Sequence, residues 1–156
     1  MYKNNNGTNL AENAEVGVIN YPASTLYKQI DLHLNNEHMI SVTDYAYRSY
    51  LETLLSYNDD AKNSWLQSAL WFKDKHGQHD TLGDANNGYK HRKNHFAESK
   101  QVEIISKIHC EMFNQPRLLI DHVPLKLVLT KNNDSFALLT ANNENVKIVI
   151  EEVYLI

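Results

Sequence analysis

The stretch Leu26-Tyr27-Lys28-Gln29-Ile30-Asp31-Leu32-His33-Leu34 decides the fold class. From Ile30 onward its apolar residues alternate with polar ones, and a period of two is typical of a half-buried β-strand. Asn35-Asn36 follows directly. Asparagine tolerates positive φ, so this pair predicts a turn into a second strand over 38–42. The chain therefore contains a predicted antiparallel hairpin.

Other segments extend this pattern to both ends of the chain. We predict further strands over 101–109, 125–129, 136–139 and 146–150. Between the two groups the period changes, since Tyr47, Leu51, Leu54 and Leu55 fall on one face of a helix predicted over 45–57. Segment 61–72 fits either a continued helix or an extended crossing. The pattern predicts a mainly β chain with a helical, aromatic-rich insertion.

Composition favours one domain inside the cell. The chain has 156 residues, 42% of them hydrophobic, and a net charge of -4. Its single cysteine, Cys110, excludes an internal disulfide framework and fits a reducing compartment. The sequence shows neither a signal peptide nor an apolar run of about 20 residues that could span a membrane. We expect a flexible polar arm over 1–14 and a folded domain over 15–156.

Histidines offer an alternative based on metal binding. His76, His79, His91 and His95 could together supply a tetrahedral zinc site, with Asp80 beside the first pair. The Cys/His framing of known zinc motifs is absent, so solvated polar segments are the favoured interpretation. We expect no metal and no cofactor.

No pattern in the sequence indicates catalysis. His109 and Cys110 are adjacent in a predicted strand, so their side chains would point to opposite faces. Phosphate-binding, dinucleotide-binding and nucleophile-elbow motifs do not occur. The sequence therefore predicts a protein that is not an enzyme.

One basic run could touch nucleic acid. It contains Lys90, Arg92 and Lys93, and the rest of the chain is acidic. Three cations give a small electrostatic footprint, so a solvated loop is favoured over a DNA contact.

Aromatic residues gather in the predicted insertion. Tyrosine and tryptophan combine a large apolar surface with a polar tip, which suits both protein interfaces and cores. Two interpretations stay open, a protein contact and packing of the insertion onto the sheet. The candidate interface residues are Tyr45, Tyr47, Tyr50, Tyr57, Trp65, Trp71 and Phe72.

Several longer segments, taken in order, resemble one family. They are Ser24-Thr25-Leu26-Tyr27-Lys28-Gln29-Ile30-Asp31, Tyr45-Ala46-Tyr47-Arg48-Ser49-Tyr50-Leu51-Glu52-Thr53-Leu54-Leu55-Ser56-Tyr57, Ile108-His109-Cys110-Glu111-Met112-Phe113-Asn114-Gln115 and Asp134-Ser135-Phe136-Ala137-Leu138. Over residues 7–156 the chain resembles the jelly-roll capsid proteins of Maverick/Polinton DNA transposons and adintoviruses.

The resemblance implies a jelly-roll β-sandwich, whole or partial, with an insertion near 45–100. It also implies a non-enzymatic virion structural protein, found in virions or inside the cell, whose partners are further copies of itself and other capsid proteins. An incomplete jelly roll would leave strand edges unpaired, which predicts self-association by strand addition or through the aromatic insertion. The alternatives are a host-adopted binding module and a histidine-based metal-binding protein.

Overall fold

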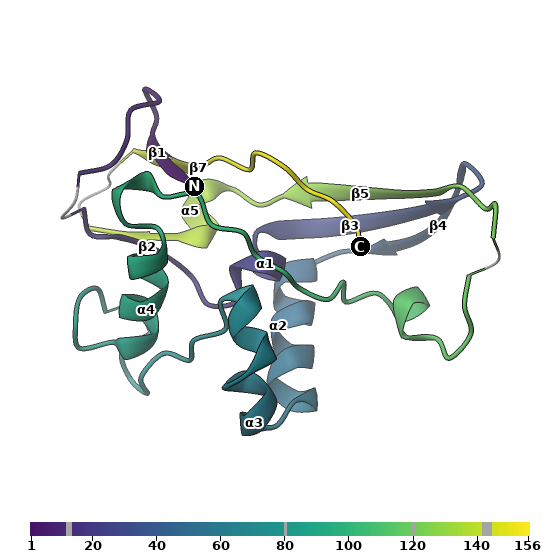
Figure 1. The fold of residues 1–156 in the computed structure, drawn as a ribbon, viewed down its shortest axis with the longest axis horizontal. Helices are drawn as coiled ribbons and strands as arrows, with labels where there is room; N and C mark the ends of the chain where they lie inside the picture. Colours follow the sequence, from purple (N-terminus) through teal and green to yellow (C-terminus); the bar gives the residue numbers. More distant parts are fainter. Residues whose placement is uncertain (12–13, 80, 120, 142–144) are drawn as a thin grey trace.

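The computed structural model describes residues 1–11, 14–79, 81–119, 121–141 and 145–156. Its strands are β1 (Tyr2–Asn4), β2 (Val16–Val18), β3 (Tyr27–Leu34), β4 (Glu37–Val42), β5 (Leu125–Lys131), β6 (Leu138–Thr140) and β7 (Val146–Ile148). Its α-helices are α1 (Pro22–Thr25), α2 (Tyr45–Ser56), α3 (Asp59–Lys62), α4 (Asn87–His95) and α5 (Asp134–Ala137), and its short 3-10 helices are η1 (Trp65–Ala69), η2 (Ala97–Ser99) and η3 (Glu111–Asn114). The strands form an upper layer, below which α2, α3 and α4 extend (Figure 1).

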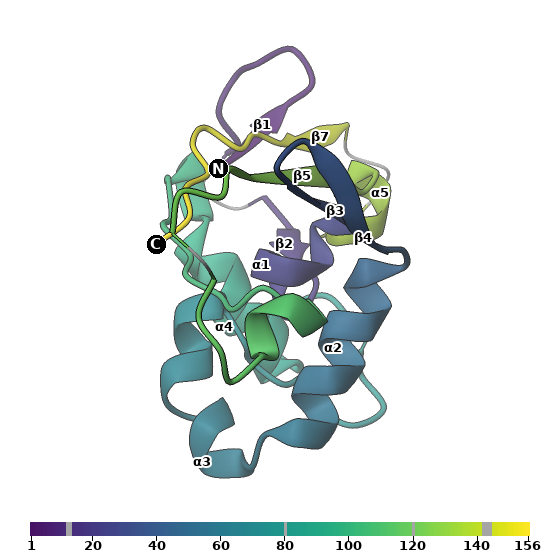
Figure 2. The ribbon, with the colours of Figure 1, turned by 90° about the vertical axis from the view of Figure 1, so that its right-hand side faces the viewer.

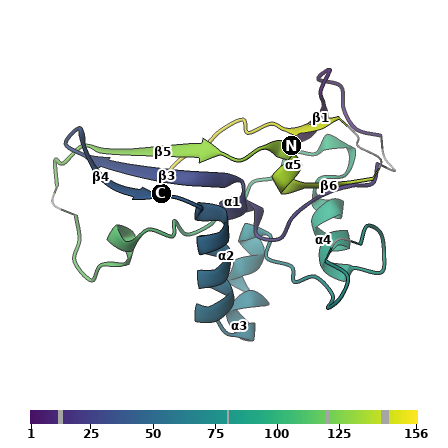
Figure 3. The same cartoon turned by 180° about the vertical axis from the view of Figure 1, so that it is seen from behind.

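The strands pair in a nested order. β1 pairs with β7, β2 with β6 and β3 with β5, and every pair is antiparallel. β4 occupies the other side of β3, which gives a sheet of order β4-β3-β5. This sheet lies at one end of the strand layer, and the two smaller sheets lie at the other (Figure 3). The pairing is that of a long antiparallel hairpin folded back on itself.

The predicted hairpin is confirmed as β3 and β4. Asn35 and Asn36 make the turn with φ values of 50° and 65°, the left-handed region that asparagine tolerates. Ile30 lies opposite Val42 on β4 and Leu129 on β5, and all three point to the same face. Ile30 is 2% exposed, so the alternation in the sequence does separate a core face from an outer face.

Other predicted strands have mixed outcomes. Those over 125–129 and 146–150 are confirmed as β5 and β7, although β7 ends at Ile148. The strand predicted over 136–139 is half wrong, since Phe136 and Ala137 lie in α5 and β6 begins at Leu138. Segment 101–109 is not assigned as a strand. Val102 and Ile104 still pack against the core, so the segment has a core face, although it pairs with no strand among the described residues.

Part of the expected flexible arm is fixed in the structure, since Tyr2 belongs to the core and β1 is paired, whereas residues 5–9 are exposed. Tyr2 is 1% exposed and stacks on Phe96 with ring centroids 4.3 Å apart. β1 is held by its pairing with β7, and the buried ring adds apolar contact to it. The expectation of a polar arm overlooked this aromatic side chain. Glu12 and Asn13 lie outside the described residues.

Helices fill the predicted insertion near 45–100. α2 begins after Asp44 and ends before Tyr57, close to the predicted bounds. Within 61–72, η1 is followed by the extended residues Trp71 and Phe72. α1 lies between the strands and α2 (Figure 2). The architecture is a mixed one of several antiparallel sheets and a few helices, in which helices contribute more than the mainly β prediction assumed.

Within the described ranges, no helix has both the length and the apolar character that crossing a bilayer requires.

Candidate functional site

Helix α2 presents apolar side chains to solvent. Tyr47, Leu51 and Leu55 are four residues apart, so they lie one above another on the same side of the helix. Their exposed fractions are 62%, 53% and 81%. We call these three residues the α2 stripe. Contiguous exposed apolar patches are uncommon on proteins that act alone and mark contact sites.

The opposite face of α2 attaches the helix to the rest of the chain. Tyr45, Ala46, Ser49 and Thr53 are buried there. The Tyr45 hydroxyl accepts a hydrogen bond of 3.0 Å from the backbone N–H of His109. Burial raises the pKa of Tyr45 to about 12, so the hydroxyl stays protonated. This anchored face forces the α2 stripe outward.

Aromatic side chains continue the apolar surface beyond both ends of the α2 stripe. At the start of α2, the Tyr47 ring meets Phe136 edge-on at 5.6 Å. Beyond the end of α2, Trp65 is 49% exposed and meets Tyr57 edge-on at 5.1 Å. A mainly apolar hollow of about 240 Å³ adjoins the first of these contacts. It is lined by Ile19, Asn20, Thr25, Ala46, Tyr47, Tyr50, Asp74, His79, Phe136 and Leu139.

The structure divides the seven predicted interface aromatics. Tyr45 and Trp71 are each 2% exposed and pack inside the chain, which corrects their assignment to an external contact. Tyr45 packs with Ile30 and Val42 on the sheet, and Trp71 packs with Tyr21 and Leu66, so neither ring can reach a partner. Tyr50, Tyr57 and Phe72 are half-buried, and Tyr50 stacks on Trp71 at 5.1 Å. Tyr47 and Trp65 remain on the surface.

Arg92 is a structural residue and not an external cation. Its side chain is 0% exposed. Nε donates to the Val18 carbonyl at 2.8 Å, Nη1 donates to the Phe72 carbonyl, and Nη2 donates to Asp74 Oδ1 at 2.7 Å. The guanidinium thereby joins α4 to β2 and to the segment after η1. This corrects the nucleic-acid alternative for Arg92, because a buried cation cannot reach a phosphate.

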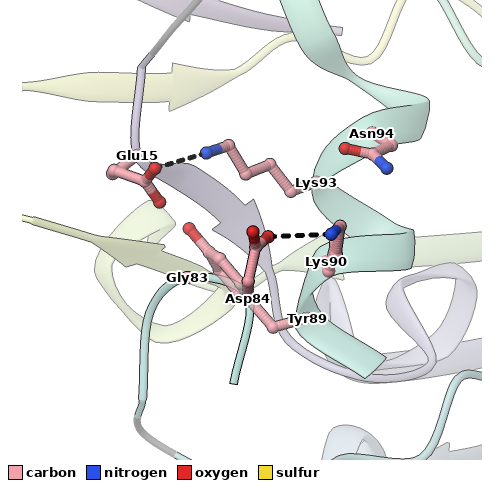
Figure 4. A pocket seen from close by; sticks show the side chains of 7 residues that line it. All are labelled: Glu15, Gly83, Asp84, Tyr89, Lys90, Lys93 and Asn94. Atoms are coloured by element: carbon pink, nitrogen blue, oxygen red, sulfur yellow. Dashed lines mark hydrogen bonds and ion pairs between the residues drawn. The ribbon is translucent and has the colours of Figure 1, made fainter. Parts of the chain in front are cut away.

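The other two cations of the basic run line a polar pocket of about 250 Å³ (Figure 4). Lys93 Nζ lies 2.6 Å from Glu15 Oε1, and Lys90 Nζ lies 3.0 Å from Asp84 Oδ1. Two cations thus face two carboxylates. Because the charges balance, the pocket has no excess positive charge to attract a phosphate.

The four histidines of the metal alternative are used in different ways. His91 and His95 both stack on Phe72, with centroids 5.2 and 5.8 Å away. His79 lies at the apolar hollow. Among the described residues, no group of three or more His, Cys, Asp or Glu side chains could hold a metal. Asp80 lies outside the described residues.

A buried polar cluster surrounds His109, which the sequence analysis considered only beside Cys110. His109 Nε2 lies 2.8 Å from the Tyr21 hydroxyl, and Nδ1 lies 3.3 Å from Glu52 Oε1. Burial lowers the pKa of His109, and the carboxylate of Glu52 partly opposes this. The His109 side chain is 0% exposed, and the cluster joins α1 and α2 to segment 101–110.

Sequence reasoning missed the direction of the α2 stripe. It placed Tyr47, Leu51, Leu54 and Leu55 on one helix face, and apolar spacing alone usually indicates a core face. Of these four, Leu54 alone is half-buried and packs against a core cluster. The residues on the other side of the helix could have indicated which face is buried. Tyr45, Ala46, Ser49 and Thr53 share that side, and the small residues among them permit close packing.

Comparisons with known proteins give one relative. No family model matches the chain, and no solved structure matches it. The chain is similar to the uncharacterized Caenorhabditis elegans protein F54H12.2, with 28% identity over 140 residues. The aligned part is 87% of this chain and 31% of the worm protein, so this chain spans about a third of the length of its relative.

Proposed function

We propose that this chain is a non-enzymatic structural domain of the capsid jelly-roll class that associates with further copies of itself through α2. The domain would contribute to a virion shell together with other capsid proteins. The α2 stripe is the observation that carries this proposal. The nested strand order supports the fold class, and the sequence resemblance supplies the biological setting.

The strand order is compatible with a jelly roll. Jelly rolls place antiparallel strands in two packed sheets joined by Greek-key connections. In this chain β1 with β7, β2 with β6 and β3 with β5 follow one wrapped hairpin. The helical insertion lies between β4 and β5, where it interrupts no strand pair.

The exposure of the α2 stripe favours a protein contact. Fully burying a leucine side chain contributes about 1.5–3 kcal/mol relative to leaving it exposed. Leu51 and Leu55 forgo more than half of that gain in the isolated chain, at 53% and 81% exposed. A two-fold contact uses the same patch on both copies and so recovers this energy twice. Trp65 at the end of the patch adds the residue type most enriched at interface hot spots.

The test is the solution mass of the chain by size-exclusion chromatography with multi-angle light scattering across a tenfold concentration range. Leu51→Glu/Leu55→Glu places two charges in the α2 stripe. Leu118→Glu/Leu119→Glu is the matched control, because it makes the same change at residues 96% and 46% exposed in a distant loop.

We expect a discrete oligomer for the wild type and the control, and a shift to a smaller species for the α2 variant. Far-ultraviolet circular dichroism of each variant checks that the fold is kept. A wild-type chain that stays monomeric over the whole range contradicts the proposal. So does an oligomer that the α2 variant leaves unchanged.

A further inference from the structure

Segment 101–108 has the form of a strand without a neighbour. Even-numbered residues from Val102 to Ile108 are half-buried, and odd-numbered ones are exposed, including Ile105 at 55%. The Ile105 N–H donates to the Ser68 carbonyl at 3.1 Å. The Ser68 hydroxyl donates to the Ile105 carbonyl at 3.3 Å. Apart from these two bonds at Ile105, no hydrogen bond joins the backbone of 101–108 to a distant segment within the described part of the chain. The segment therefore presents a free edge that can accept a strand.

The C-terminal segment, residues 150–156, has the composition of a strand and also lacks a neighbour. Val149 exchanges backbone hydrogen bonds of 3.0 and 3.1 Å with Met1. Beyond Val149, the described residues contain no backbone partner for the segment. Val153, Tyr154 and Leu155 are 58%, 56% and 58% exposed. Valine, tyrosine, leucine and isoleucine side chains are therefore exposed to solvent outside any strand, although most of them favour strands.

These two segments lie on the same side of the strand layer (Figures 1 and 2). The Tyr154 hydroxyl donates to the Glu103 carboxylate, which shows that they can meet. Their charges are opposite in balance, because Lys100 precedes one segment and Lys107 lies within it together with a single carboxylate, Glu103. Glu151 and Glu152 lie near the start of the other segment. In the single chain this contact buries little of the C-terminal segment, whose apolar residues from Val153 to Ile156 stay more than half exposed.

We infer that the free edge of 101–108 binds the C-terminal segment of a second copy of this chain by β-strand addition. Every copy carries both the edge and the added strand, so an exchange between two copies forms the contact twice. Backbone hydrogen bonds hold the added strand, and alternate side chains set its register. This inference rests on the proposed self-association but uses a surface separate from the α2 stripe.

The experiment is cross-linking between two differently tagged full-length chains. Both carry Cys110→Ala to remove the native thiol. One carries Glu103→Cys and the other carries Tyr154→Cys, and the mixture is treated with a short bifunctional maleimide. The control pairs Leu118→Cys with Tyr154→Cys, since Leu118 is 96% exposed and belongs to neither segment.

We expect the Glu103–Tyr154 pair to give at least about tenfold more mixed dimer than the control at roughly 0.1 mM chain, because proximity raises the effective thiol concentration into the millimolar range. Mixed dimer no more abundant than the control overturns the inference. A chain with both cysteines that links only within itself also overturns it. If cross-linking fails while Leu51→Glu/Leu55→Glu still dissociates an oligomer, strand addition is wrong and the proposed function stands.

Discussion

Replacing Arg92 tests whether the buried guanidinium holds the domain together. Arg92→Met keeps the apolar stem and removes every donor that now binds the Val18 and Phe72 carbonyls and Asp74. The Asp74 side chain is only 12% exposed, so its carboxylate would be left almost buried without a partner.

The size of the effect follows from these contacts. Removing one partner of a buried ion pair lowers the free energy of unfolding by about 3–5 kcal/mol. Each carbonyl left without its donor costs about 1–3 kcal/mol. These terms overlap within one network, so we expect a total loss of about 4–6 kcal/mol. A domain has about 5–15 kcal/mol of stability, and Arg92→Met should therefore be largely unfolded or close to it.

Urea denaturation followed by tryptophan fluorescence measures this loss. Arg48→Met is the control, because Arg48 forms a 2.9 Å ion pair with Glu111 in which both side chains are exposed. Exposed pairs contribute about 0–1 kcal/mol. Arg92→Lys keeps the charge but cannot serve three acceptors, so it should fall between the two. An Arg92→Met chain as stable as Arg48→Met would refute the structural role of Arg92.

Two further predictions concern the helical layer. Gly88→Ala should destabilise the domain by about 1–3 kcal/mol, because the new methyl group would push α4 away from the backbone at Lys73. Without this contact, alanine would be the better helix former. The new Cβ would lie 2.5 Å from the Lys73 carbonyl oxygen, and exposed Lys90→Ala in the same helix serves as control for thermal melting. His109→Gln should flatten the pH dependence of stability below the ordinary histidine pKa of 6.5. The folded state lowers the pKa of His109, so the unfolded chain binds the proton more readily and wild-type stability is full above about 6.5 and falls as the pH decreases. Equal pH dependence of the urea midpoint in both proteins would contradict this.

Local patterns in the sequence predicted local structure well. The period of two in 26–34 and the asparagine turn at 35–36 correspond to β3 and β4, because strand faces and turn geometry depend on neighbouring residues. The same period in 101–109 predicted a strand that did not form. Alternation shows which side chains face the core, whereas a ladder also needs a partner strand from elsewhere in the chain.

Long-range packing explains what the sequence could not predict. Arginine is rarely buried, so a basic run suggested exposed cations, and nothing nearby in the sequence indicated that Asp74 and two carbonyls would enclose Arg92. The α2 stripe is a similar case. Its spacing is visible in the sequence, but its exposure depends on the opposite helix face packing against the chain.

The nested pairing has a consequence for the time course of folding. The Met1 amino group donates a hydrogen bond to the Val149 carbonyl, and these two residues are 148 positions apart in the sequence. β1 therefore has no strand neighbour until β7 has formed. Chains rich in such distant contacts fold slowly, since loop closure must precede any gain from the contact. On the ribosome, β1 would emerge before β7 and would find its partner only after the segment between the two strands had been synthesised. Until then Tyr2 has no β7 beside it, and the nascent chain depends on the β3–β4 hairpin, whose strands follow one another directly.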